Sequence, residues 1–318
     1  MERAYTCSRC GAPLEVTPET IIAICPYCGF PTVLSGVVDV NDVYILPAVQ
    51  PKIIEERFQR ELHTDFDLRR IRNEITPRRI EGVYVPLWVA EVYVKGVVSY
   101  YYYVTRNKKR KRVYRVENID KNILLKLVAR RQIATLGVNE LEDTINREAL
   151  SKSKKLIEVT PEEWSTIKLE VLNTEFDKKS ATERIREDAV DYVRKSYEEK
   201  GTIDGFNVSS KVVEDPFLLL VPLWYMYYQY RDSIYYMVFS GWDGRLLVKT
   251  EPVTSTRRIM YLAGSILSVL SASALAYLVY LSSKSSNELG ASLLLPLIPV
   301  YFAFHLGRQI IKDIRIER

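Results

Sequence analysis

The C-terminal part of the chain places the strongest constraint on its structure. Residues 259–281 contain no charged side chain, and a second uncharged run, 289–307, follows a short polar turn at 282–288. Each run is long enough to cross a hydrocarbon core of about 30 Å as a helix. The first run is apolar on all sides, unlike an amphipathic surface helix. The pattern predicts a two-helix transmembrane hairpin within residues 256–318.

The flanking charges predict an orientation for this hairpin. Arginines precede the first run, and basic residues follow the second: Arg257, Arg258, Arg308, Lys312, Arg315 and Arg318. The connecting turn carries Lys284, which is offset by Glu288. Because basic residues stay on the cytoplasmic side, we expect a multi-pass protein of the cell membrane with its N-terminal body and C-terminus both cytoplasmic. The N-terminus shows no signal-peptide pattern.

Small residues recur every four positions along the first uncharged run. They are Gly264, Ser268, Ala272 and Ala276. Small side chains allow close helix packing in lipid. The stripe therefore predicts packing within the hairpin, with homo-oligomerisation as the alternative.

The N-terminal segment, residues 1–36, carries all four cysteines of the chain in two Cys-x-x-Cys-Gly motifs. The predicted metal ligands are Cys7, Cys10, Cys25 and Cys28. Four thiolates complete a tetrahedral structural Zn²⁺ site and leave no open position for catalysis. The alternatives are redox iron and disulfides, and a cytosolic location disfavours disulfides. We expect a small β zinc ribbon, with strands at 14–16 and 21–24 forming a hairpin.

The middle of the chain, residues 37–255, predicts an α+β body with an internal duplication. A Pro-Leu-Trp sequence occurs at 86–88 and again at 222–224, inside runs rich in β-favouring residues. Helices are expected before each copy, and a second strand is expected after each. The helices are at 53–62 and 182–200, and the paired strands are at 82–94 with 97–104 and at 220–227 with 233–239. This gives two related antiparallel-sheet-plus-helix units, at about 45–117 and 180–252. A further helix is expected at 122–136.

A strongly basic segment lies between two strand-like runs of the first unit. Its residues are Arg106, Lys108, Lys109, Arg110, Lys111, Arg112 and Arg115. Such a segment can bind anionic lipid or nucleic-acid phosphates. It can equally be a solvated charged loop. The nearby tyrosines favour sheet faces over base-stacking platforms.

The order of these features resembles a family of zinc-ribbon membrane proteins of archaea and bacteria. The resemblance rests on the cysteine pairs, the Gly-Val-Tyr-Val-Pro-Leu-Trp run at 82–88, the Gly-Trp-Asp-Gly turn at 241–244 and the terminal membrane runs. Members are labelled transcription factor B-type zinc ribbon or primosomal replication-factor-like proteins. The family implies no established activity, and the chain has no Gly-x-x-x-x-Gly-Lys-Ser/Thr phosphate loop.

The residues favour a non-enzymatic function. No nucleophile–base pair stands out, the chain has two histidines, and carboxylates such as Glu142 fit solvated helix faces. We expect a membrane-anchored scaffold or adaptor that presents a cytosolic protein-binding surface. The alternative is a membrane-tethered nucleic-acid-binding module that uses the basic segment 106–115 and the ribbon. A third hypothesis is an enzyme whose site would be a deep pocket lined by carboxylates of perturbed pKa.

Overall fold

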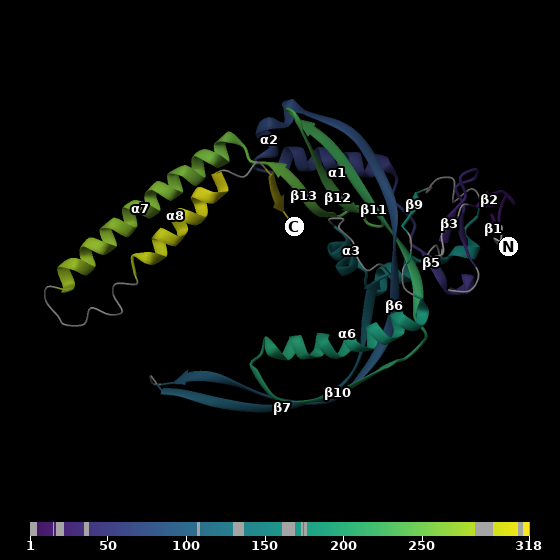
Figure 1. Cartoon of the computed structure of the whole chain (residues 1–318), viewed down its shortest axis with the longest axis horizontal. Helices are drawn as coiled ribbons and strands as arrows, with labels where there is room; N and C mark the ends of the chain where they lie inside the picture. Colours follow the sequence, from purple (N-terminus) through teal and green to yellow (C-terminus); the bar gives the residue numbers. More distant parts are fainter. Residues whose placement is uncertain are drawn as a thin grey trace. The chain divides into compact units, whose positions relative to one another are not determined.

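The computed structural model describes residues 5–14, 16, 22–34, 38–106, 109–129, 137–160, 169–172, 174, 177–283, 295–310 and 314–317 (Figure 1). The described chain is a mixed α+β structure with antiparallel sheets. It forms two compact units. The first unit comprises residues 1–54, 80–225 and 238–247, and the second comprises 55–79, 226–237 and 248–318.

The first unit begins with two small hairpins. Strand β1 (Tyr5–Thr6) pairs with β2 (Pro13–Leu14), and β3 (Ile22–Ile24) pairs with β4 (Pro31–Val33), both antiparallel. The expected pairing of 14–16 with 21–24 is therefore wrong for the described residues, because each strand pairs across its own Cys-x-x-Cys turn. The turn residues lie between paired strands, so folding of each hairpin positions its two cysteines.

A long strand organises the rest of the first unit. Strand β6 (Ile75–Arg106) pairs antiparallel with β7 (Lys109–Val128) from Leu87 to Arg106. It pairs with β10 (Thr202–Val212) between Val92 and Tyr101, and β11 (Phe217–Tyr230) is its other long neighbour. Short strands complete this sheet: β5 (Val43–Ile45), β8 (Lys154–Lys155) and β9 (Glu170–Val171).

Two expectations about this sheet are wrong. Residues 97–104 are not a separate strand after a turn but the continuation of β6. Residues 122–128 are not helical, because they belong to β7 and pair with Leu87–Tyr93 of β6. The proposed duplication stays a prediction: Trp88 and Trp224 are both buried and lie in the neighbouring strands β6 and β11.

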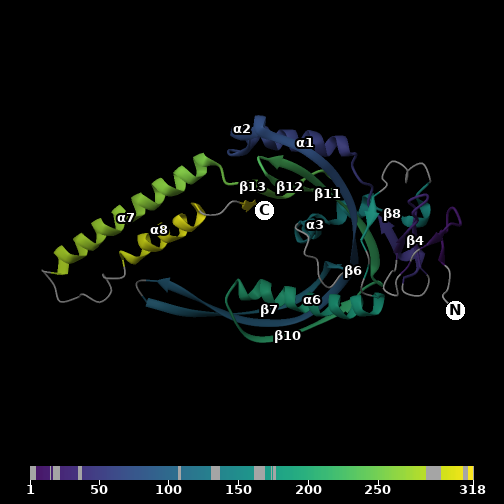
Figure 2. The ribbon, with the colours of Figure 1, turned by 45° about the horizontal axis from the view of Figure 1, so that its top comes forward.

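Helix α6 (Lys178–Glu198) lies along β10 and β7 (Figures 1 and 2). The side chain of Asp177 caps its N-terminus by accepting a hydrogen bond from the Ser180 amide, at 2.9 Å. Its buried stripe follows a four-residue period: Ala181, Ile185, Ala189, Val193 and Tyr197. This stripe explains why the segment is a helix, since it places one apolar face against the sheet. The unit also contains η1 (Val40–Asp42), α3 (Val138–Thr144), α4 (Arg147–Lys152) and η3 (Leu156–Glu158).

The second unit combines the end of β11 with β12 (Ser233–Ser240), β13 (Leu246–Pro252) and β14 (Ile314–Glu317), in that order across the sheet. Helix α1 (Pro51–Thr64) packs Phe58 against Tyr228, with ring centroids 5.6 Å apart. Two short helices follow α1: α2 (Leu68–Ile71) and η2 (Arg72–Glu74).

The second unit also contains helices α7 (Ser255–Ser283) and α8 (Leu297–Ile310), which run antiparallel and side by side (Figures 1 and 2). Within the described residues, α7 alone is long and apolar enough to cross a membrane, over Ser255–Leu281, and only 11% of its most apolar window is buried. Helix α8 has 14 described residues. The first part of the second predicted run, residues 289–294, lies outside the described residues. A two-helix transmembrane hairpin is therefore not shown.

Candidate metal centre and basic arm

Two equivalent turns position the four cysteines. In each turn the amide of the glycine after the second cysteine donates to the carbonyl of the first, Gly11 to Cys7 at 3.0 Å and Gly29 to Cys25 at 2.8 Å. Both glycines have a positive φ, 73° and 71°. Glycine adopts this left-handed conformation without strain. The Cys-x-x-Cys-Gly spacing therefore produces a turn that aims two sulfur atoms the same way.

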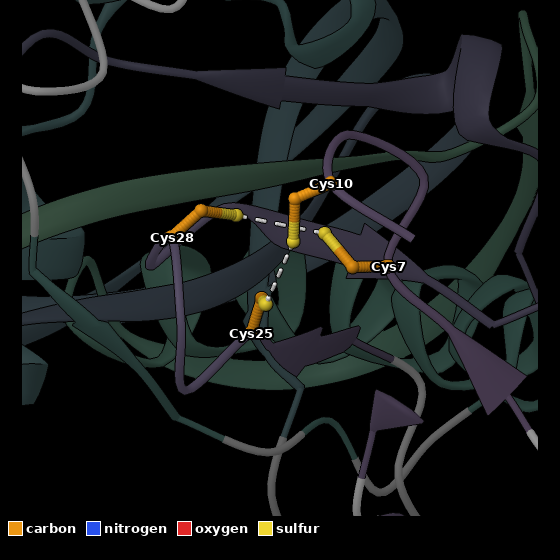
Figure 3. A group of neighbouring side chains, drawn as sticks. All are labelled: Cys7, Cys10, Cys25 and Cys28. Atoms are coloured by element: carbon orange, nitrogen blue, oxygen red, sulfur yellow. Dashed lines mark hydrogen bonds between the residues drawn. The ribbon is translucent and has the colours of Figure 1, made fainter. Parts of the chain in front are cut away.

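The four sulfur atoms converge on one point (Figure 3). All four Sγ atoms lie within 4.8 Å of one another. The separation is 3.6 Å between Cys7 and Cys28 and 3.5 Å between Cys10 and Cys25. Four thiolates bound tetrahedrally to a metal at about 2.3 Å would be separated by about 3.8 Å. A disulfide needs about 2.05 Å, and all four cysteines are free thiols. The arrangement fits a four-thiolate metal ion.

Polar groups around Cys7 favour its thiolate form, whereas the pKa of Cys28 is raised, mainly by burial. The Thr32 hydroxyl lies 3.8 Å from Cys7 Sγ, and the Arg9 amide donates to the same sulfur at 3.4 Å. Burial alone would raise the pKa of the Cys7 thiol, but hydrogen bonds from the amides of Cys10 and Arg9 outweigh it and lower the pKa to about 6. Thiolate is the form that binds metal.

The cysteine cluster also forms the centre of a small apolar core. Cys7 and Cys25 are buried together with Leu14, Ala23 and Leu34. This core is too small to hold a segment of this length folded on its own. A metal ion bound at the cluster would supply the missing stabilisation, and four protein ligands would leave no position for a substrate.

The basic segment lies at the end of a two-stranded projection. We call residues 101–106 of β6 and 109–116 of β7 the basic arm. Strand β10 ends its pairing with β6 at Tyr101, so beyond that residue the described arm has only its own two strands (Figures 1 and 2). Of the predicted binding residues, Arg110, Lys111, Arg112 and Arg115 are exposed in the arm. Lys108 lies outside the described residues, and Arg106 and Lys109 are described only as strand residues.

Tyrosines hold the arginines of the arm in place. The guanidinium of Arg112 lies 4.2 Å from the ring centroid of Tyr101, and it donates to the hydroxyls of Tyr114 at 2.8 Å and Tyr103 at 3.0 Å. The guanidinium of Arg110 lies 4.4 Å from the ring centroid of Tyr103. Cation–π contacts of this kind stabilise a hairpin that has little else to pack against.

The predicted small-residue stripe of α7 lies partly against α8. The Ser265 hydroxyl donates to the Ala303 carbonyl at 3.1 Å, and a side chain at Gly264 would meet Leu306 at 3.0 Å. Ala272 is buried and Ser268 is half-buried, whereas Ala276 is exposed. The buried side of α7 therefore does not include Ala276. It includes Val279 in its place, which is buried.

Replacing Gly264 by leucine is expected to separate α7 from α8, because the new side chain meets Leu306. The matched control is Gly307→Leu, since a Cβ atom there meets nothing within 4 Å. Crosslinking between introduced photoreactive residues on the two helices measures the effect. Equal crosslinking in the two variants would contradict the packing described here.

A buried ion-pair cluster in the second unit was not anticipated from the sequence. Lys249 Nζ lies 2.6 Å from both Asp65 Oδ2 and Glu251 Oε1. Beside it, Asp67 accepts from the Thr254 hydroxyl at 2.8 Å and pairs with Arg257 at 2.6 Å. Glu251 is 1% exposed, so these charges depend on one another. The cluster ties the loop after α1 to the first turn of α7.

Glu142 in α3 is half-buried rather than fully solvated as expected. Burial, more than its acidic neighbours Asp143 and Asp188, raises the pKa of Glu142 to about 7, against the opposing effect of Lys126. Its folded-state pKa is above the unfolded value of about 4.3. Folding stability should therefore fall as pH rises from about 4 to 7.

Glu142→Gln is expected to remove that loss of stability between about pH 4 and 7, because glutamine does not ionise. Unfolding midpoints of the wild type and the variant across this range measure the difference. Glu140→Gln, a change in the same helix, is the control. Identical pH profiles for Glu142→Gln and the wild type would contradict the assignment.

Comparisons with known proteins give no family. No family model matches the chain, and neither the curated proteins nor the solved structures provide a match. The resemblance to zinc-ribbon membrane proteins is therefore supported only through its cysteine cluster. Fold and site together define an α+β protein with a four-cysteine candidate metal centre and, within the described residues, one helix of membrane-spanning length.

Proposed function

We propose that the protein is a non-enzymatic scaffold, anchored in a membrane by α7, whose metal ribbon and α+β body present a protein-binding surface. The exposure of α7 carries this proposal. Exposed side chains include Leu262, Leu267, Leu270 and Leu278, each at least 51% exposed. A helix that packs in a soluble core buries its apolar side chains, and α7 does not. A lipid environment would remove this apolar surface from water.

The metal of this proposal is structural zinc. Zinc favours four thiolates in a closed tetrahedral site, and the sulfur separations suit it. Iron prefers similar ligands, so elemental analysis of the purified chain distinguishes the two metals. The ribbon itself would then serve as a rigid docking element, since four protein ligands leave the metal without a catalytic position.

The proposed orientation follows the basic residues. Arg257 and Arg258 lie in the first turn of α7, so we place this end and the α+β body on the cytoplasmic side. Helix α8 packs antiparallel on α7 and is proposed as the second span of a hairpin, which returns the C-terminus to the cytoplasm. Its described length of 14 residues corresponds to about 21 Å, so residues preceding it would have to complete the crossing.

Membrane anchorage is tested by placing charges on exposed apolar positions. Leu267→Lys with Leu270→Lys is expected to release the chain from membranes, because each lysine costs about 2.5–3.5 kcal/mol at the centre of a spanning helix. The matched control is Ile157→Lys with Ile234→Lys, which changes equally exposed apolar positions outside α7. Alkaline extraction of membranes measures the partition. A wild-type chain that is itself extracted, or two variants that behave alike, would contradict the proposal.

The scaffold role is tested by its partners. The chain is captured from crosslinked membranes with and without nuclease, using the Leu267→Lys/Leu270→Lys variant as the unanchored comparison. Protein partners that survive nuclease and depend on anchorage are expected. Loss of the captured material on nuclease treatment would favour the nucleic-acid-binding alternative, and capture of the chain alone would indicate a homo-oligomer.

A further inference from the structure

The two faces of the basic arm differ in what covers them. At the base of the arm, alternation along the paired strands places Tyr100 and Glu117 on one face, where Tyr197 of α6 donates to Glu117 Oε2 at 2.8 Å. The opposite face carries Tyr101, Tyr103, Arg110, Arg112, Tyr114 and Val116. We call this second set the open face.

The open face combines apolar and basic side chains that are exposed to solvent. Tyr103 is 45% exposed, Tyr114 is 57% exposed and Val116 is 70% exposed. Residues 106–115 include no acidic side chain in the sequence. The positive charge makes the surface complementary to a polyanion. Contact with phosphate groups alone would leave its apolar side chains exposed to water, so a partner with apolar groups beside its phosphates fits it better.

The tyrosine rings distinguish between two polyanions. Single-stranded nucleic acid binds through bases stacked on open aromatic faces. Here guanidinium groups already cover the rings of Tyr101 and Tyr103. A phospholipid surface needs no open ring face, since tyrosine rings lie at the headgroup level and arginines reach phosphate from there.

We infer that the open face of the basic arm docks on the anionic phospholipid surface of the membrane in which α7 is anchored. This inference rests on the proposed membrane anchorage. It adds a second, peripheral contact to the spanning helix, made by a β-hairpin through basic and aromatic side chains. Each neutralised basic residue is expected to weaken this contact about fivefold.

Hydrogen exchange of the full chain in nanodiscs tests this contact. The bilayers are phosphatidylcholine alone or a mixture with phosphatidylserine. Exchange in peptides covering 101–116 is expected to slow several-fold in the phosphatidylserine bilayer and to recover at high salt. Arg110→Gln, the change of one basic residue on the open face, should weaken the arm's contact about fivefold and reduce the slowing. The Arg110 substitution leaves the Arg112–tyrosine contacts in place.

The matched control is Lys52→Gln with Lys195→Gln, two exposed lysines outside the arm, which should keep the slowing. Equal exchange in the two bilayers with the chain incorporated would overturn the arm inference and leave α7 anchorage standing. Slowing by a single-stranded oligonucleotide but not by phosphatidylserine would overturn it in favour of nucleic acid. A chain that enters neither bilayer would overturn the anchor and the arm inference with it.

Discussion

Replacing Cys7 by serine is expected to abolish metal binding and to unfold the ribbon while leaving the chain in the membrane. Oxygen replaces one of four sulfur ligands, and bound zinc supplies about 10–16 kcal/mol of folding free energy in comparable small sites. The apolar core around the cluster, with Leu14 and Leu34, cannot replace it. Metal analysis and hydrogen exchange of residues 5–34 measure the loss.

The control for this substitution is Tyr27→Ser in the second turn, where the side chain is 72% exposed and the group that hydrogen-bonds to Cys25 is the backbone amide, which the change keeps. It should keep the metal and the protection of the ribbon. Cys25→Ser should behave like Cys7→Ser, since the two cysteines occupy equivalent positions. Equal metal content in the cysteine and tyrosine variants would remove the metal assignment.

Replacing Lys249 by methionine is expected to destabilise the second unit by about 3–5 kcal/mol. The substitution leaves Asp65 and Glu251 as two buried carboxylates without the ammonium group between them. The midpoint of thermal unfolding in detergent measures the effect. Arg147→Met is the control, because its partner is Glu91 in an exposed pair and such pairs contribute little. Equal midpoints for the two variants would contradict the importance of the buried cluster.

The same cluster sets a dependence on pH at both ends of the range. Burial alone would raise the pKa of Asp65, but hydrogen bonds from Lys249 and from the amides of Leu68 and Asp67 outweigh it and lower the pKa. The stability from Asp65 is therefore present above about pH 4 and lost as pH falls through the lowered value. The pKa of Lys249 is raised, since its hydrogen bonds to both carboxylates outweigh burial. The folding stability that Lys249 contributes is therefore present below about pH 10 and is lost as pH rises further.

The sequence was most informative where the signal is local. The cysteine pairs and their glycines lie within single turns, and the converging sulfurs follow from that spacing. The apolar run that became α7 is likewise a property of one continuous segment. Which metal is bound, whether α8 crosses the membrane and what the chain does remain predictions.

The sequence was least informative where distant segments meet. Two strands were expected at 82–94 and 97–104, but both belong to β6, and Gly96 lies inside it, where a side chain would collide with the Asn207 carbonyl of β10. A short apolar run such as 122–128 is compatible with either a helix or a strand. Its pairing with β6, a distant segment, makes it a strand. The buried cluster joins Asp65 and Asp67 to Lys249 and Arg257, and only the fold brings them together. Charged residues at alternate positions of β13, Lys249 and Glu251, were the one signal that could have indicated it.

The most direct test is the metal-to-protein ratio of the full chain solubilised by detergent from salt-washed membranes. A ratio of about one zinc per chain in this fraction is expected, because the closed cysteine site and the exposed apolar α7 belong to the same molecule. A chain that the salt wash releases would contradict the anchor. A membrane-retained chain without metal would contradict the assignment of the four cysteines as a metal site.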